Sequence, residues 1–400
     1  MLRAPTRRTR LATSLALVII LGVSGAIVVL RAQPDPLLLL DAAAREFDRG
    51  RVDDAEVLLD RRARRVHPTA LDLILRARIS QAREHFDESL RVLCCVPDSD
   101  PFAGRARLLA GEIELDRDHA RAAERLLARA VALDPHQVAA RRDLAYIYAL
   151  QRRRRDCDAQ FRALVELGPL DEKRAFIWCQ NLCAIWDPRE AAARLERFVK
   201  NDPGDRQSRL ALVEAYLMMS QVSAAEEAIG PLDVEDDNAR ALRARIALDR
   251  GDESAAESLV QAGASDHAGL NVIRARLALI RQDPTGASHF FEAVLKQDPH
   301  DRAALYGLGQ CLRRLNEPRA ITYLEQVARE DRLKRMILES KGPLGQDPRL
   351  YFKLGQACEE LGQTREALTW YGLAIARDPL DTQAQSARAR LKPSGGTGRF

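Results

Sequence analysis

Seven cysteines and seven histidines are the residues of this 400-residue sequence that most readily bind metals or act as nucleophiles. Cys179 and Cys183 lie one helical turn apart, which would supply half of a metal site. The histidines form no HExxH spacing, so we interpret them as isolated surface groups. We interpret the cysteines as free thiols that pack as small apolar residues, and leave the role of the adjacent Cys94 and Cys95 open. The histidines are His67, His85, His119, His136, His267, His289 and His300, and the remaining cysteines are Cys157, Cys311 and Cys358.

Other catalytic patterns are also missing from the sequence. There is no GxxxxGK[ST] phosphate loop, and the GLGQCL segment at Gly307 does not fit a dinucleotide-binding pattern. Neighbouring acids such as Glu359 and Glu360 are typical of solvated helix surfaces. The arginine run 152–155 is interpreted as a solvated turn, with a docking patch for an acidic partner or an anionic membrane as the alternative. The sequence therefore predicts no enzyme, no metal site and no cofactor.

Composition and charge narrow the class of protein further. With 46% hydrophobic, 30% charged and 5% aromatic residues, the chain can bury a large core, and this excludes a disordered or polytopic membrane protein. Residues 1–31 hold five arginines and no acid, which leaves 57 basic and 58 acidic residues elsewhere. Because the excess charge belongs to the N-terminal segment, the sequence predicts no nucleic-acid partner.

The N-terminal segment predicts a membrane anchor. Residues 11–30 contain no charge and are long enough as a helix to span a bilayer, and four arginines precede them. We expect a basic cytoplasmic N-terminus at 1–10 and a transmembrane signal anchor at 11–30. The remaining chain is then extracytoplasmic, in the periplasm. A cleaved signal peptide is the alternative.

A fixed period dominates the rest of the chain. Prolines occur at 101, 135, 169 and 203, three intervals of 34 residues, and most of these prolines follow an aspartate. Similar QDP and RDP triplets end at Pro299 and Pro379. Prolines at a constant spacing indicate that the same pair of helices ends repeatedly.

The clearest copy is the segment 350–379. Its small, aromatic and turn positions match one repeat pattern, at Tyr351, Leu354, Gly355, Gly362, Ala367, Tyr371, Ala374 and Pro379. Small residues at Gly355 and Ala367 would let two helices approach closely, and Gly362 would allow the turn between them. The segment resembles the tetratricopeptide repeat family, in its membrane-anchored bacterial form. The excess of arginine over lysine, 55 to 7, indicates a GC-rich bacterial genome.

The resemblance implies an all-α fold, a right-handed alpha-alpha superhelical solenoid of about ten helix-turn-helix repeats after the N-terminal transmembrane helix. We expect degenerate repeats at 37–68 and 69–101, regular repeats at 102–135, 136–169 and 170–203, shortened repeats at 204–234 and 235–265, and further repeats at 266–299, 300–328 and 346–379. We further expect an insertion at 329–345, a capping helix at 380–392 and a flexible tail at 393–400.

The resemblance also implies a function. The first helices of such repeats line a concave groove that binds a protein or peptide, so we expect a membrane-anchored scaffold or adaptor without catalysis or a small-molecule substrate. An accessory assembly or regulatory subunit of an envelope enzyme or secretion complex is the alternative. The groove positions implied by the pattern are Tyr146, Phe176, Gln180, Leu210, Glu214, Arg245, Arg276, Tyr306, Gln310, Arg313, Phe352 and Gln356. Among them, Arg245, Arg276 and Arg313 would favour an acidic partner.

Overall fold

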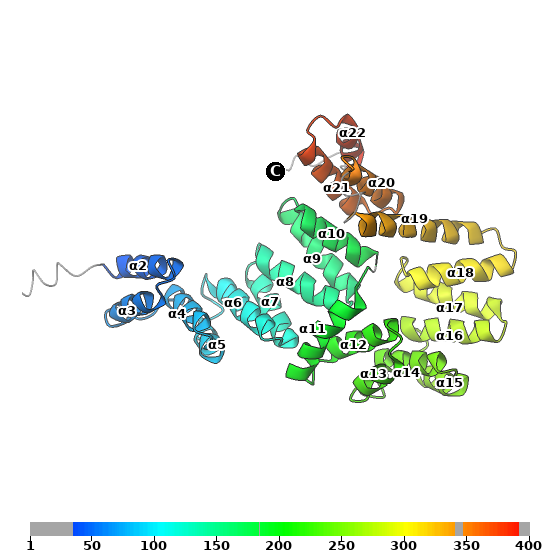
Figure 1. The fold of residues 1–400 in the computed structure, drawn as a ribbon, viewed down its shortest axis with the longest axis horizontal. Helices are drawn as coiled ribbons and strands as arrows, with labels where there is room; N and C mark the ends of the chain where they lie inside the picture. Colours follow the sequence, from blue (N-terminus) through cyan, green and yellow to red (C-terminus); the bar gives the residue numbers. More distant parts are fainter. Residues whose placement is uncertain (1–34, 184, 341–346, 392–400) are drawn as a thin grey trace, which may run out of the picture. The chain divides into compact units, whose positions relative to one another are not determined.

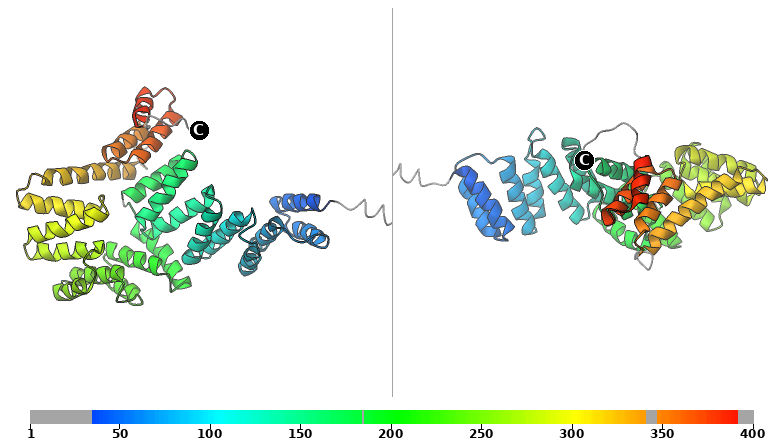
Figure 2. Two further views of the ribbon diagram at one scale, coloured as in Figure 1. Left: turned by 180° about the vertical axis from the view of Figure 1, so that it is seen from behind. Right: turned by 90° about the horizontal axis from the view of Figure 1, so that it is seen from above.

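The computed structural model describes residues 35–183, 185–340 and 347–391, and these residues form 21 α-helices and no strand (Figure 1). They divide between two compact units, one up to residue 113 and one from residue 114. Most helices that follow each other in the chain pack against each other, and Figure 2 shows these helix pairs from two further sides. The predicted all-α helical-repeat fold is therefore confirmed.

The first unit is built from helix pairs around a small aliphatic core. Its helices are α2 (Pro36–Asp48), α3 (Val52–Ala63), α4 (Ala70–Ala82), α5 (Phe86–Cys94) and most of α6 (Ala103–Asp116). Ala43, Ala55 and Leu59 form the core between the first helices. A buried ion pair joins α3 to α4, with Arg62 Nε 2.6 Å from Asp72 Oδ1. Both side chains are almost completely buried, so removing either one would leave a charge without its partner.

The second unit contains the remaining helices and most of the buried surface. These helices are α7 (Ala120–Leu133), α8 (Val138–Leu150), α9 (Arg154–Leu167), α10 (Glu172–Leu182), α11 (Pro188–Asn201), α12 (Arg206–Met218), α13 (Val222–Ile229), α14 (Asp237–Asp249), α15 (Glu253–Ala262), α16 (Ala268–Ile280), α17 (Pro284–Gln297), α18 (Arg302–Arg314), α19 (Ala320–Glu339), α20 (Leu350–Glu360), α21 (Thr364–Arg377) and α22 (Thr382–Leu391). Helix α19, with 20 residues, includes the start of the segment 329–345.

Aspartate–proline pairs end four helices of the second unit. The residue before a proline is disfavoured in the α region, and in each pair the aspartate is extended, with φ between −130° and −137°. Each carboxylate also accepts a hydrogen bond of 3.0–3.1 Å from the backbone N–H two residues later. These turns satisfy backbone groups that a helix end leaves free. They end α7, α11, α17 and α21, at Asp134, Asp202, Asp298 and Asp378.

The glycines of the clearest repeat act as the sequence predicts. A Cβ on Gly355 would lie 2.5 Å from Cε1 of Tyr371, so α20 and α21 can approach this closely only with glycine at that position. Gly362, between the same helices, has a φ of +72°, in the left-handed region that favours glycine. The close approach leaves Tyr371 completely buried.

The prediction of an N-terminal transmembrane helix requires a correction. In the part of the chain that the structure describes, no helix is both long enough and apolar enough to cross a membrane. The predicted span, residues 11–30, lies outside the described residues, as do the predicted cytoplasmic segment 1–10 and the tail 393–400. The predicted single-pass membrane localisation is corrected on the same finding.

Candidate functional site

The predicted groove positions differ in how far solvent reaches them. They lie on α8, α10, α12, α14, α16, α18 and α20, which alternate along the second unit. Four of these side chains are exposed, six are half-buried and two are buried. In that order they are Tyr146, Tyr306, Arg313 and Gln356, then Phe176, Gln180, Glu214, Arg245, Arg276 and Gln310, then Leu210 and Phe352.

The positions on α14, α16 and α18 carry an excess of positive charge. Arg276 Nη2 lies 3.2 Å from Asp249, and Arg245 Nε lies 3.7 Å from the same residue, so one carboxylate faces two guanidinium groups. The pair with Arg276 joins α16 to α14, which pack against each other. On α18, Arg313 donates to the neutral amide oxygen of Gln310 at 2.6 Å. We call Arg245, Arg276, Tyr306, Gln310 and Arg313 the α14–α18 surface.

Two tyrosines leave their rings accessible to a partner. Tyr306 on α18 is 49% exposed and Tyr146 on α8 is 43% exposed. An accessible aromatic ring beside arginine and amide side chains is the composition of many protein-binding hot spots. Tyr306 belongs to the same helix as Arg313, and so the α14–α18 surface offers an aromatic anchor as well as charge.

Two of the predicted positions instead contact the protein's own helices. Phe176 on α10 packs edge-on against Trp370 on α21, with ring centroids 4.8 Å apart. Phe352 on α20 is buried against Tyr371 of α21, with centroids 5.7 Å apart. Both aromatics therefore contribute to internal packing.

The positions on α12 are also engaged within the chain. Leu210 belongs to the core cluster that contains Phe198 of α11. The carboxylate of Glu214 lies 2.5 Å from Nε of Arg152, in the turn before α9. The arginine run is thus part of an intrachain network.

The rest of that arginine run confirms its structural role. Arg153 contacts Glu124 of α7 at 2.7 Å, and its guanidinium lies 4.2 Å from the centre of the Tyr148 ring. Arg154 donates to the backbone oxygen of His300 at 3.2 Å, a residue 146 positions further on. The run is therefore paired within the chain, although Arg152 and Arg155 remain exposed, as the interpretation of a solvated run predicts.

A contact between distant repeats closes the second unit. Helix α10 packs against α19 and α21, so the middle of the chain meets its C-terminal helices (Figure 1). Ala175 and Cys179 of α10 share one apolar cluster with Tyr351, Cys358 and Trp370 of α20 and α21. We call this cluster the closing contact.

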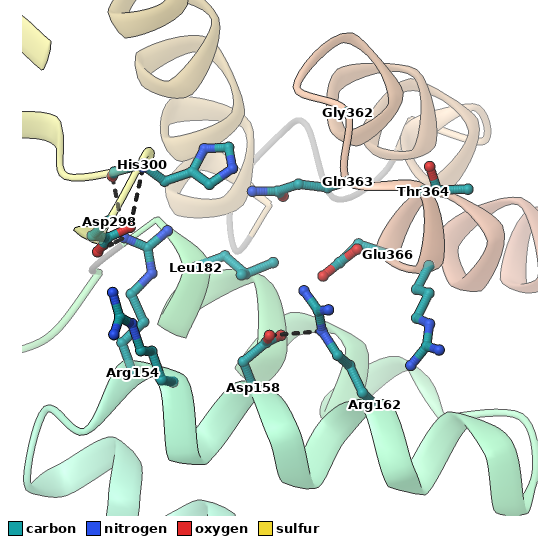
Figure 3. Close-up of a pocket in the computed structure, with 12 residues that line it drawn as sticks. Arg154, Asp158, Arg162, Leu182, Asp298, His300, Gly362, Gln363, Thr364 and Glu366 are labelled. Atoms are coloured by element: carbon teal, nitrogen blue, oxygen red, sulfur yellow. Dashed lines mark hydrogen bonds and ion pairs between the residues drawn. The ribbon is translucent and has the colours of Figure 1, made fainter. Parts of the chain in front are cut away.

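A polar cavity lies beside the closing contact (Figure 3). It measures about 310 Å³ and lies between α9, the turn before α18 and the start of α21. Asp158 forms an ion pair with Arg162 at 2.7 Å and accepts a hydrogen bond from the indole N–H of Trp178 at 2.9 Å. Arg154 lies 3.8 Å from Asp298 across the cavity. The pair of Arg154 with Asp298 therefore joins α9 to the turn before α18.

The cavity is lined by one carboxyl group with a shifted pKa and by two polar atoms without hydrogen-bond partners. Burial raises the pKa of Glu366, which is 3% exposed and lies near Asp158 and Arg162. Within the described residues, Gln363 Oε1 and His300 Nδ1 are buried without a hydrogen-bond partner, although Glu330 lies 3.7 Å from the histidine nitrogen. The cavity therefore combines a carboxyl group whose pKa is raised with one histidine nitrogen and one amide oxygen that lack hydrogen-bond partners.

Sequence reasoning missed the closing contact and its residues. Trp370 and Cys179 are 191 positions apart, and the sequence suggests only a packing role for Cys179 within its own repeat. No local signal shows that they meet, because their distance depends on how the intervening helices curve.

The described residues can also be considered as possible metal ligands. Across residues 35–183, 185–340 and 347–391, no group of three or more His, Cys, Asp or Glu side chains is placed to hold a metal ion. The side chains described there form internal ion pairs and buried thiols, which contribute to packing, and exposed helix surfaces, which are accessible for binding.

One protein family matches two segments of the chain. A family model described as tetratricopeptide repeat matches residues 187–230 and 274–331, which include α11, α12, α13, α17 and α18 and parts of α16 and α19. The match to these segments supports the predicted repeat family. A comparison with curated proteins finds no match.

Three solved structures are similar to the chain at low sequence identity. A tetratricopeptide repeat protein from Parabacteroides merdae ATCC 43184 is 13% identical, covers 61% of this chain and 98% of its own, and has a TM-score of 0.32. The hetero-tetramer of Cut9 and Hcn1 from the APC/C is 13% identical over 93% of this chain and 91% of its own, with a TM-score of 0.36. The P58(IPK) TPR domain is 14% identical over 80% and 97%, with a TM-score of 0.31. The support for the repeat family comes from the family model.

Proposed function

We propose that this chain is a protein-interaction scaffold that binds an acidic segment of a partner protein across the α14–α18 surface. Similarity to tetratricopeptide repeats, which the family model finds from residue 274 of α16 through α18, suggests interaction with proteins. The observation that carries the choice of surface is the sharing of Asp249 by Arg245 and Arg276, which leaves positive charge uncompensated.

The chemistry of the surface supports an extended acidic segment. Carboxylates of the partner would replace the long contact between Arg245 and Asp249, and would compete with Gln310 for Arg313. Charge-assisted hydrogen bonds from arginine to a carboxylate are stronger than the bond to a neutral amide. The exposed Tyr306 ring would pack against an apolar side chain of the same segment.

Other predicted groove positions contribute less to this proposal. Phe176 and Phe352 are engaged with Trp370 and Tyr371, so a partner would have to displace internal packing to reach them. Binding on α14, α16 and α18 requires no such displacement. The proposed action is binding, without catalysis.

The test is a titration of the full-length protein with two labelled peptides of equal length. One alternates glutamate with leucine, the other lysine with leucine, and fluorescence anisotropy reports binding. The variant Arg245→Glu, Arg276→Glu, Arg313→Glu reverses the charge of the surface. A matched control reverses three exposed arginines on α3, α6 and α7, namely Arg61, Arg105 and Arg125, and so has the same net charge.

We expect the unmodified protein to prefer the acidic peptide, and its affinity to fall as salt is added. Reversing the three arginines of the surface should weaken binding by about tenfold or more, and the control should change it little. Equal weakening by both variants would show that net charge, and not this surface, attracts the peptide. Unchanged binding in both would overturn the proposal.

A further inference from the structure

Three thiols meet at the closing contact. Cys179 lies on α10, Cys183 directly follows the last residue of that helix, and Cys358 lies on α20. Cys179 and Cys358 are buried, whereas Cys183 is half-buried at the edge of the same apolar cluster. Cys179 and Cys358 belong to that one cluster, and the Cys179 side chain raises the pKa of Cys358, so the two thiols interact.

The indole of Trp370 fixes one of these sulfurs in place. Its Nε1–H donates to Cys179 Sγ at 3.0 Å, and its ring packs against Phe176 one turn earlier on α10. The thiol of Cys179 is therefore held against α20 and α21 by the same side chain that closes the unit.

The other cysteines are placed differently. Cys157 contacts the backbone oxygen of Ala145 in the neighbouring helix at 3.5 Å, and Cys311 is buried in the cluster around α17 and α18. Cys94 and Cys95 are exposed in the first unit. A bond between Cys179 and Cys358 is distinctive because it would join helices that are far apart in the sequence and meet at the closing contact.

We propose that Cys179 and Cys358 are a redox-active pair whose disulfide covalently locks the closing contact. The oxidant is a small-molecule disulfide such as oxidised glutathione, which reacts by thiol–disulfide exchange. A thiolate of the pair attacks one oxidant sulfur and releases the first small thiol. The second cysteine then attacks the mixed disulfide and releases the other. Two S–H bonds and the oxidant's S–S bond break, and one protein S–S bond and two small thiols form. The pair loses two electrons, which reduce the oxidant, and its two protons end on the released thiols.

The closed unit protects the reduced pair. The Cys179 side chain and burial raise the pKa of Cys358, and burial raises the pKa of the neighbouring Cys183. Because the thiolate is the attacking form, exchange is slow while α10 is packed against α20 and α21. Exchange should accelerate when the closing contact opens briefly, and also as the pH rises.

The lock would alter motion within the second unit. Opening of the closing contact separates α10 from α20 and α21, and a bond between Cys179 and Cys358 forbids that separation. Hydrogen exchange of backbone amides in α10 and α21 reports such opening directly.

The experiment uses the reduced full-length chain with Cys94→Ser and Cys95→Ser, which removes the exposed thiols of the first unit. The protein is incubated with oxidised glutathione in mild urea, alkylated and digested, and linked peptides are identified by mass spectrometry. Cys358→Ala and Cys179→Ser each remove one partner, and Cys183→Ser is the matched control. Circular dichroism checks that each variant remains helical.

We expect a peptide pair linked through Cys179 and Cys358, present in the Cys183→Ser control and absent from the other two variants. After urea is removed, the oxidised protein should show amide exchange in α10 and α21 slowed by about tenfold or more. If a partner variant loses its helicity, the linked peptides of the unmodified pair decide the result. Linkage through Cys183, or free thiols at both positions after oxidation, would overturn the proposal.

Discussion

The closing contact predicts an energetic coupling between two aromatic side chains that lie on distant repeats. Phe176 on α10 and Trp370 on α21 should be tested by the single changes Phe176→Ala and Trp370→Ala and by the double change. Trp370 is 1% exposed, so its truncation should lower the free energy of unfolding by about 3–5 kcal/mol. Phe176 is half-buried, and its truncation should cost about 1–2 kcal/mol.

The informative quantity is the departure from additivity. An edge-on aromatic pair with centroids 4.8 Å apart should contribute about 0.5–1.5 kcal/mol beyond the burial of each ring. The loss in the double variant should therefore be smaller than the two single losses together by that amount. Urea unfolding of the reduced full-length protein, followed by far-UV circular dichroism, measures all four free energies.

Two control cycles make the result interpretable. Phe161 and Trp178 are stacked 5.8 Å apart on the neighbouring helices α9 and α10, so they should also be coupled. Trp370 paired with Phe291 of α17 should be additive within about 0.5 kcal/mol, because Phe291 belongs to a different core cluster. Additivity of Phe176 with Trp370, alongside coupling in the first control, would refute the closing contact.

Two further changes test the packing and the electrostatics of the second unit. Gly355→Ala places a methyl group 2.5 Å from the Tyr371 ring and should lower the free energy of unfolding by about 1–3 kcal/mol. Gly372 has open space around it, so Gly372→Ala should raise the free energy of unfolding by about 0.5–1 kcal/mol. Urea unfolding measures both changes. The Arg206 guanidinium lowers the pKa of Asp236 from 3.8 to about 2, so this carboxylate stabilises the fold above pH 3.8 and loses that effect as the pH falls toward 2. Asp236→Asn keeps the helix cap and should cost about 1–2 kcal/mol at pH 7, and thermal melts should show the difference from the unmodified protein narrowing below pH 3.8. A cost that stays constant with pH, or an alanine at 355 that is tolerated as well as one at 372, would contradict these assignments.

The local features of the fold could be predicted because each depends on neighbouring residues. An aspartate before a proline cannot continue a helix, which is why the spacing of Pro135 and Pro203 marks real helix ends. The small residue at Gly355 and the turn at Gly362 follow in the same way from the backbone geometry of one helix pair. Each of these features depends only on residues within about one repeat.

The closing contact could not be predicted from the sequence, because it depends on the sum of many small rotations between successive helices. Whether Phe176 lies on a free surface or against Trp370 is decided by the curvature of the helices between them. The same holds for Arg152 and Arg154, whose partners Glu214 and His300 lie far along the chain. From the sequence alone, a run of charged residues is interpreted as solvated, because the sequence does not show which distant residues pair with it.

The candidate surface was predicted only in part. The repeat pattern indicates which positions belong to the first helices, and the positively charged residues Arg245, Arg276 and Arg313 are accessible or half-buried. It does not indicate that Asp249 is shared between two of them, because that depends on how closely α14 approaches α16.

Site-specific photo-crosslinking tests the proposed surface most directly. A photoreactive phenylalanine analogue replaces Tyr306 on α18 in one sample and Leu380, which is 85% exposed and lies between α21 and α22, in another. Each tagged full-length protein is illuminated with the labelled acidic peptide, and linked products are quantified by mass spectrometry. We predict strong linkage at position 306, weak linkage at 380, and loss of the linkage at 306 when Arg245, Arg276 and Arg313 are changed to glutamate. Equal linkage at both positions, or linkage at 306 that survives the charge reversal, would contradict binding at the α14–α18 surface.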